Sequence, residues 1–234
     1  MKIIFEKYET LFCILLIVLY VTINSYCIQN FGMNDCRTAI INTGISIFLI
    51  VLMIILKRTK YYGLTKVNNL KEYLYFFPLL IISSVNIWNG INVNNSKEEI
   101  VFNILTMINV GFIEEIIFRG FLFKMMEKSN LKIAIIVSSI TFGIGHIVNL
   151  LNGADLIPTL LQLCYAIAIG YVFVTIFNKS KSLIPCIISH QLINALAIFN
   201  VENRSFEYII SVVLIIISVS YAMYINKRVK ALAE

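Results

Sequence analysis

The stretch VGFIEEIIFRGF, residues 110–121, places two adjacent glutamates and an arginine inside sequence that is otherwise apolar. Charged side chains are costly in the hydrocarbon of a membrane, where they usually face a bundle interior or a water-filled cavity. Glu115 and Arg119 are four residues apart with the acid first, which favours an ion pair along one helix. Glu114 lies about 100° around the helix from Glu115, so it need not share that pair.

The composition of the chain indicates a polytopic membrane protein. Of its 234 residues, 59% are hydrophobic and only 14% are charged, and the mean hydropathy is +0.85, which is too apolar for the wetted surface of a soluble domain. Its apolar runs are each close to the ~20 residues that cross a bilayer as a helix. We therefore expect an all-α bundle of about eight transmembrane helices, forming a single transmembrane domain over residues 1–234. The runs lie near residues 10–30, 38–56, 73–90, 100–123, 131–152, 156–178, 182–200 and 206–226.

The basic residues predict how the chain is oriented. If the N-terminus lies in the cytoplasm and the runs alternate, fifteen of the 19 basic residues fall in cytoplasmic segments and three in outer ones, as the positive-inside rule requires. We therefore expect a multi-pass protein of the cell membrane with both termini in the cytoplasm. Because the basic residues are scattered, they predict contact with anionic membrane lipid and no nucleic-acid partner. The cytoplasmic set is Lys2, Lys7, Lys57, Arg58, Lys60, Lys66, Lys71, Lys124, Lys128, Lys132, Lys179, Lys181, Lys227, Arg228 and Lys230, and the outer set is Arg37, Lys97 and Arg204.

The longest connection between runs covers about residues 57–72 and contains Tyr61, Tyr62 and Gly63. It is cytoplasmic in the expected orientation and carries several basic side chains. We expect it to form a hairpin on the surface of the bundle.

Two further polar motifs lie in later runs and contain the two histidines of the chain. FGIGH puts Phe142 and His146 on one helix face, and its two glycines allow close helix packing. HQLIN puts His190 and Asn194 on one face in the same way. Counted at about 1.5 Å per residue from the nearest basic side chains, Glu114, His146 and His190 lie about 15, 21 and 14 Å deep. Three helices are therefore expected to bring these groups into one site.

The three motifs together resemble those of a known family. EEIIFRG resembles the EExxxR motif of the CPBP family, the CAAX proteases and bacteriocin-processing enzymes also called the Abi family, which is related to type II CAAX prenyl proteases. FGIGH matches the FxxxH motif of that family and HQLIN its HxxxN motif, in the family's order and each within its own apolar run. The resemblance covers about residues 100–200, where we expect the catalytic core.

The resemblance implies an intramembrane endopeptidase and gives each motif residue a role. Glu114 would activate the attacking water and His146 would help to hold it. His190 and Asn194 would donate hydrogen bonds to the oxyanion. Peptide hydrolysis needs a base near the attacking water and donors where negative charge develops, so the residue types suit the reaction. The supporting residues would be Glu115, Arg119 and Phe142.

Two mechanisms fit these residues, one with a metal and one without. Glu114, His146 and His190 form a set that could hold zinc and leave a position open for water. The common zinc arrangement HExxH has two histidines one turn apart on one helix, and this sequence lacks it. We therefore favour a glutamate mechanism without a cofactor, with zinc as the alternative.

The expected substrate is a membrane-associated peptide or a membrane protein. The bare architecture and a composition rich in Ile, Asn and Lys are typical of a bacterial member, for which the resemblance implies bacteriocin maturation, self-immunity or processing of peptide signals. Two other classes also place polar groups in a bundle: a non-catalytic scaffold or regulator, and a proton-coupled transporter. A transporter needs polar residues along a path through both halves of the membrane, whereas those found here cluster at one depth.

Overall fold

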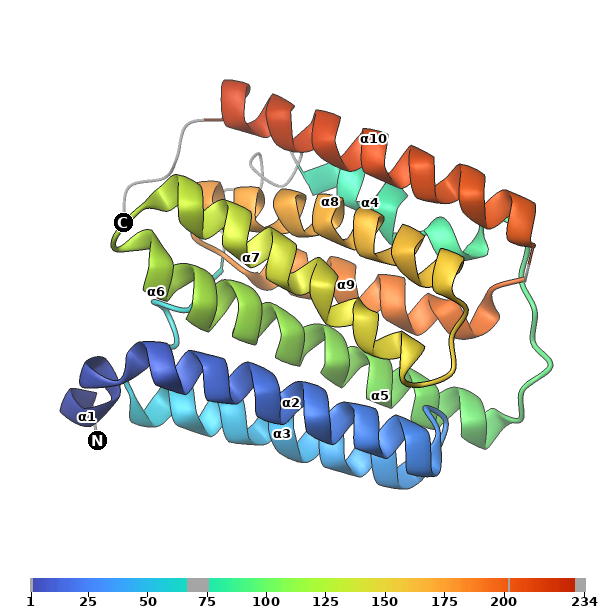
Figure 1. Cartoon of the computed structure of the whole chain (residues 1–234), viewed down its shortest axis with the longest axis horizontal. Helices are drawn as coiled ribbons and strands as arrows, with labels where there is room; N and C mark the ends of the chain where they lie inside the picture. The colour runs from blue at the N-terminus through green and yellow to red at the C-terminus, as the bar shows by residue number, and fades with distance from the viewer. Residues whose placement is uncertain (1, 67–75, 202, 230–234) are drawn as a thin grey trace.

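The computed structural model describes residues 2–66, 76–201 and 203–229. These residues form helices without any strand, and the long helices lie side by side in one elongated bundle (Figure 1). The all-α class is therefore confirmed. The α-helices are α1 (Lys2–Lys7), α2 (Glu9–Phe31), α3 (Cys36–Ile55), α4 (Phe77–Ser83), α5 (Lys97–Glu115), α6 (Lys124–Glu127), α7 (Leu131–Gly145), α8 (Leu156–Ser180), α9 (Ile184–Leu196) and α10 (Arg204–Arg228). A π-helical segment, η3 (Ile116–Phe123), joins α5 to α6, and short 3₁₀ segments are η2 (Val85–Ile87), η4 (His146–Leu150) and η5 (Ala197–Phe199).

Six helical stretches of the described chain are long and apolar enough to cross a membrane, which confirms a helical membrane bundle. The expected number of eight is not confirmed. The run predicted at 182–200 forms a shorter helix, Ile184–Phe199, and the described part of the run at 73–90 forms only α4 and η2. Pro78 and Pro185 stand in the first turns of α4 and α9, where proline starts a helix but cannot extend it backwards. The start of the run at 73–90 lies outside the described residues, as do Lys71 and Lys230.

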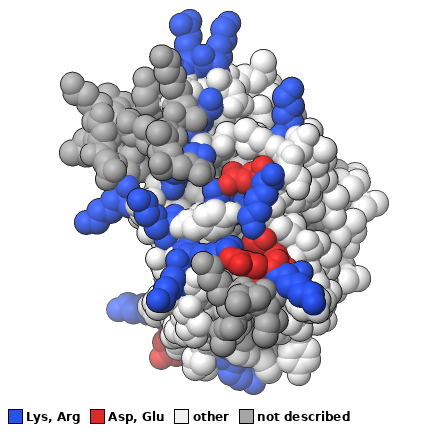
Figure 2. Space-filling model, turned by 90° about the vertical axis from the view of Figure 1, so that its left-hand side faces the viewer, with Lys and Arg blue, Asp and Glu red and all other residues white. Residues whose placement is uncertain are grey.

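The connections between helices alternate between the two ends of the bundle (Figure 1). The chain after α3, the α6–α7 turn and the α8–α9 connection lie at the left in this view, and the α2–α3, α4–α5, α7–α8 and α9–α10 connections lie at the right. Figure 2 looks onto the left-hand end and shows many Lys and Arg side chains gathered there. We call this end, which carries Lys57, Arg58, Lys60 and Lys128, the basic end.

Side-chain caps fix where two of the site-bearing helices begin. The Ser96 hydroxyl accepts a hydrogen bond from the Glu99 backbone N–H at 3.2 Å, and the Glu99 carboxylate accepts one from the Ser96 N–H at 2.8 Å. This capping box satisfies N–H groups that have no partner inside α5. Asn130 begins α7 in a similar way, because its side chain accepts from the Ile133 N–H at 3.1 Å. The caps thereby set the register of the motif residues further along each helix.

The second half of the α5 region is π-helical, with hydrogen bonds that reach one residue farther than in an α-helix. All eight residues of Ile116–Phe123 are buried. The apolar pattern of the sequence predicted an uninterrupted ordinary helix here and carries no sign of the wider turn. Arg119 lies in this segment, and π-helical turns occur frequently at functional sites.

The described part of the connection after α3, up to residue 66, packs into the basic end and does not form the surface hairpin that the sequence predicted; residues 67–72 lie outside the described residues. Tyr62 is fully buried, and its ring lies 4.4 Å from the ring of Phe121 in η3. Gly63 has a φ of +85°, and an added Cβ there would collide with the Phe177 ring. The Leu183 N–H donates to the Gly63 carbonyl at 2.9 Å. The described part of this connection is therefore held between η3 and the α8–α9 turn.

Candidate active site

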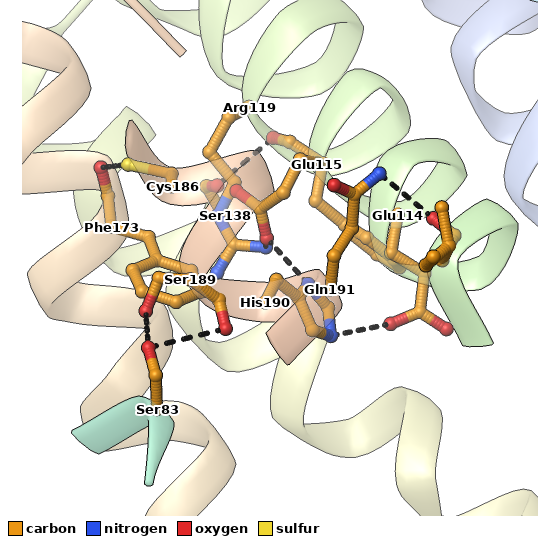
Figure 3. A network of polar contacts seen from close by, with 12 residues as sticks. Ser83, Glu114, Glu115, Arg119, Ser138, Phe173, Cys186, Ser189, His190 and Gln191 are labelled. Carbon is orange, nitrogen blue, oxygen red and sulfur yellow. Dashed lines mark hydrogen bonds and ion pairs between the residues drawn. The ribbon is translucent and has the colours of Figure 1, made fainter. Parts of the chain in front are cut away.

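The two adjacent glutamates face different surroundings. The side chain of Glu115 is fully buried, whereas that of Glu114 is 15% exposed. Glu115 Oε1 accepts a hydrogen bond from Arg119 Nη1 at 2.9 Å, which confirms the ion pair predicted from their spacing. The same oxygen lies 2.9 Å from Nδ1 of His190. Figure 3 shows the His190 ring between the two carboxylates, with Arg119 on the far side of Glu115.

Arg119 is enclosed by aromatic rings. Its guanidinium carbon lies 4.1 Å from the ring centre of Phe142 and 5.6 Å from that of Phe173. Among the described residues, its Nε and Nη2 atoms have no hydrogen-bond partner. The ring faces take the place of acceptors, since such a contact is worth about 2 kcal/mol when the cation is desolvated. Gly170 leaves room for this packing, because an added Cβ would lie 3.0 Å from Arg119 Nη2 and 3.1 Å from Phe142.

Glu115 orients the imidazole of His190. An ionised carboxylate can only accept a hydrogen bond, so the Nδ1 atom that faces Glu115 carries a proton. The Nε2 atom then points toward Glu114, 3.6 Å from its Oε2. Helix α9 can approach α5 this closely because residue 111 is glycine: an added Cβ there would lie 2.9 Å from the backbone nitrogen of Gln191.

Tyr20 joins the site from α2, a helix outside the three motifs. Its buried hydroxyl donates a hydrogen bond to Glu114 Oε1 at 2.9 Å. The sequence does not distinguish this tyrosine from the other eleven, because the contact joins residues 94 positions apart. With Oε1 bound by Tyr20, Oε2 is the oxygen of Glu114 that is available for chemistry.

A cavity of about 60 Å³ lies beside Glu114 and is also lined by His146. Glu114 and His146, which stands half-buried at the start of η4, therefore face one shared space. A cavity of this size holds a few water molecules but not a peptide. Its other polar lining residues are Tyr20, Asn24, Ser25, Asn149 and Asn152.

Phe142 packs against both imidazoles. Its ring centre lies 5.5 Å from that of His146 and 5.4 Å from that of His190, with the rings close to perpendicular at 84° and 88°. Because it also lies under the guanidinium of Arg119, this side chain contacts three of the residues singled out from the sequence. Its edge-on contacts fix the orientation of two rings at once.

The two glycines of FGIGH differ in their effect. At Gly143 an added Cβ would lie 2.9 Å from the carbonyl oxygen of Leu163 and would collide with the Ile167 side chain. This glycine therefore lets α7 pack tightly on α8, as the sequence predicted. At Gly145 the nearest atom is 4.0 Å away, in Phe118, and the residue lines the cavity.

Asn194 makes fewer contacts with the site than the other motif residues do. It lies one turn after His190 on α9 and is half-buried. Within the described part of the chain, its side chain makes no hydrogen bond. The amide is therefore free of competing partners on the helix that carries His190.

The zinc alternative has no preformed set of ligands. Among the described residues, no three His, Cys, Asp or Glu side chains converge closely enough to hold a metal ion. The set of Glu114, His146 and His190 therefore does not fit a bound zinc in this arrangement.

The fold and the site together define a polytopic membrane protein with a buried carboxylate–histidine centre. The sequence model of the family described as "Type II CAAX prenyl endopeptidase Rce1-like" matches residues 96–196, a stretch that runs from the cap of α5 to the end of α9 and contains all three motifs. This part of the chain belongs to the CAAX protease family, and the resemblance carried by the motifs is confirmed. No curated protein and no solved structure is significantly similar to the chain.

Proposed function

We propose that this intramembrane CAAX-type endopeptidase hydrolyses a peptide bond of a membrane-associated peptide or protein with Glu114 as the general base. The supporting observation is the contrast between the two glutamates. Glu115 is sealed against Arg119 and His190, whereas Glu114 opens on a water-sized cavity that it shares with His146. A general base must reach the water that it activates, and Glu114 has that access.

The reaction begins with a water molecule between Glu114 and His146. Glu114 Oε2 takes a proton from this water while the water oxygen attacks the scissile carbonyl carbon. The carbonyl oxygen becomes an oxyanion, which accepts hydrogen bonds from the Asn194 amide and from Nε2–H of a doubly protonated His190. Glu114 then passes its proton to the amide nitrogen as the C–N bond breaks, which leaves a carboxylic acid and an amine, and the acid gives its remaining proton to the amine.

Glu115 and Arg119 support this chemistry without touching the substrate. The Glu115 carboxylate accepts a hydrogen bond from Nδ1 of His190 and so holds the ring with Nε2 toward Glu114. Arg119 balances the charge of Glu115 and is itself fixed by the rings of Phe142 and Phe173. The pair therefore maintains the donor of the proposed oxyanion site.

We propose that the reaction needs no metal. Incubation of purified, active protein with a chelator such as EDTA should leave the rate of peptide cleavage unchanged. Loss of cleavage on chelation, restored by added zinc, would support the alternative in which Glu114, His146 and His190 are ligands.

We infer that the protein lies in a cell membrane with its basic end in the cytoplasm. The gathering of Lys and Arg at one end (Figure 2) supports this orientation, because such residues are enriched in cytoplasmic connections. The N-terminus and the end of α10 then both face the cytoplasm. For a bacterial member, bacteriocin maturation, self-immunity and processing of peptide signals all involve membrane-associated peptides of the proposed substrate class.

The decisive experiment compares the peptides of cells that carry the wild-type protein, the Glu114→Gln variant or no protein. Cleavage products that depend on the wild-type protein should be absent from the other two strains. Glu98→Gln is the matched control, because Glu98 lies exposed on the same helix, and it should give the wild-type products. If Glu114→Gln gives the wild-type products and keeps the biological function, the protein is a scaffold or regulator and not a protease.

A further inference from the structure

The cavity beside Glu114 extends toward one end of the bundle. Along α2 it is lined in turn by Tyr20, Asn24, Ser25 and Ile28, in the direction in which α2 reaches its end opposite the basic end (Figure 1). Facing them, the lining continues from His146 through Asn149 to Asn152 in the turn after η4. The polar lining therefore leads away from the basic end.

In the other direction, buried aromatic side chains fill the space between the site and the basic end. The ring of Phe121 lies 4.4 Å from that of Tyr62, 5.8 Å from that of Phe12 and 6.3 Å from that of Phe5. Phe118, one turn nearer to Glu114, is also buried and packs against Phe142 at 5.6 Å. Among the described residues, these rings pack closely enough to leave no gap for water or peptide between Glu114 and the basic end.

Hydrogen bonds join the two walls of the cavity at the end opposite the basic end. Asn152 Oδ1 accepts one bond from the Ser25 hydroxyl and one from Gln29 Nε2, both at 2.9 Å. Gln29 Nε2 also lies 3.3 Å from the Leu151 carbonyl oxygen. We call these bonds of Ser25 and Gln29 to Asn152 the Asn152 contact. At about 60 Å³ the cavity is too small for a peptide, so this contact must open before a substrate can reach Glu114.

We propose that peptide substrates reach Glu114 from the end opposite the basic end, between α2 and the turn after η4, when the Asn152 contact opens. This proposal rests on the proposed function and specifies its substrate class. With the basic end in the cytoplasm, the substrates are peptides whose scissile bond is presented at the outer face of the membrane. Hydroxyl and amide groups line the route, with Glu114 as its carboxylate, so it suits an uncharged, extended stretch of polypeptide. To open this route, only the part of α2 after Asn24 has to move. Tyr20 can therefore keep its hydrogen bond to Glu114.

Thiol labelling from the two sides of the membrane tests the route. Val21 lines the cavity one position after Tyr20, so Val21→Cys places a thiol deep in the route. The five native cysteines are first replaced, and the peptide products of the cells show whether this background is still folded and active. Vesicles of either orientation are then treated with a small membrane-impermeant methanethiosulfonate, and labelling is followed by mass spectrometry.

The proposal predicts labelling of Val21→Cys from the outer face and not from the cytoplasmic face. Lys60→Cys is the control, because Lys60 is itself exposed at the basic end, and it should be labelled from the cytoplasmic face. Labelling of Val21→Cys from the same side as Lys60→Cys, or from neither side, would overturn the proposal.

The Asn152 contact has its own test in the same background. Asn152→Ala removes the acceptor of two hydrogen bonds and should raise the labelling rate of Val21→Cys about fivefold or more, as expected for the loss of even one ordinary hydrogen bond. Asn30→Ala is the matched control, because Asn30 is exposed and bonds only within α2, to the Tyr26 carbonyl. An equal rate in Asn152→Ala and Asn30→Ala would contradict the role of the contact.

Labelling does not depend on cleavage, so the two proposals fail separately. Glu114→Gln combined with Val21→Cys should show the same sidedness as Val21→Cys alone. If this pattern holds but no peptide product depends on Glu114, the route stands and the protease assignment fails. If products depend on Glu114 but labelling comes from the basic end, the protease assignment stands and the route fails.

Discussion

Glu114 and Glu115 are chemically identical neighbours, yet the two sides of α5 that they face have opposite characters. On the Glu115 side, a guanidinium, an imidazole and two aromatic rings exclude water completely. On the Glu114 side, the carboxylate accepts a hydrogen bond from the Tyr20 phenol, lines a water-sized cavity and remains partly exposed. The comparison teaches that a fully buried acid held by an arginine and a histidine can serve structure, while a partly exposed acid next to it remains available for proton transfer.

Glu114→Gln is expected to have the largest effect on activity and a small effect on stability. A general base contributes about 10²–10⁴-fold to a rate, so peptide cleavage should fall by that factor. The thermal unfolding midpoint of the detergent-solubilised protein should stay close to wild type, because the amide fills the same space and water can reach it. A large fall in the unfolding midpoint would show that Glu114, like Glu115, mainly stabilises the fold.

Glu115→Gln should have the opposite effect: the main loss is expected in the stability of the fold and not in the cleavage rate. It leaves the buried Arg119 without its anionic partner, which costs about 3–5 kcal/mol of unfolding free energy. The measurement is again the unfolding midpoint. Arg204→Gln is the matched control: it breaks an ion pair with Asp155 whose side chains are both 68% exposed, and such pairs are worth less than about 1 kcal/mol. Similar midpoints for the two variants would refute the structural role of Glu115.

Gly170→Ala tests whether the aromatic enclosure of Arg119 is tightly fitted. The added methyl group would press on both Arg119 and Phe142, and overpacking of this kind costs about 1–3 kcal/mol. The unfolding midpoint should therefore fall. Gly44→Ala provides the control, because an added Cβ there meets no atom within 4 Å and should not lower the midpoint.

Tyr20→Phe should have the smallest effect. It removes the hydrogen bond to Glu114 Oε1, but the exposed fraction of Glu114 allows water to replace the phenol. A loss of about tenfold in cleavage rate, equivalent to ~1.4 kcal/mol, is expected from one hydrogen bond to a charged group. Kinetics on a peptide identified from the cells would measure it. Tyr26→Phe, on the exposed face of the same helix, should cleave at the wild-type rate.

Local spacing in the sequence was sufficient to predict the ion pair that stabilises the site. The ion pair of Glu115 with Arg119 follows from a four-residue separation on one helix, and the structure confirms it. The placement of His190 beside the carboxylates required the further inference that polar groups at one depth share a site, and this also agrees with the structure. The catalytic roles assigned to Glu114, His146, His190 and Asn194 stay predictions.

Contacts made by residues outside the three motifs were not predictable from the sequence. Tyr20 and Tyr62 look like the other tyrosines of an apolar chain, and only the packing of α2 and the α3 connection brings them to Glu114 and Phe121. The count of eight spanning helices was not confirmed because hydropathy measures how apolar a run is and not where proline limits a helix. Pro78 and Pro185 indicated where α4 and α9 begin, and so how long these helices are, which the hydropathy of the runs does not show.

The π-helical segment has a consequence for how this chain tolerates changes in length. A π-helical turn holds one residue more than an α-helical turn, so a deletion after Arg119, within residues 120–123, can be absorbed by a return to α-helical winding that keeps the spacing of Glu115 and Arg119. A deletion earlier in α5 has no such reserve and would rotate both glutamates by about 100° relative to the cap at Ser96. Changes in length along this helix therefore differ in their effect, and the stretch after Arg119 is the more permissive one.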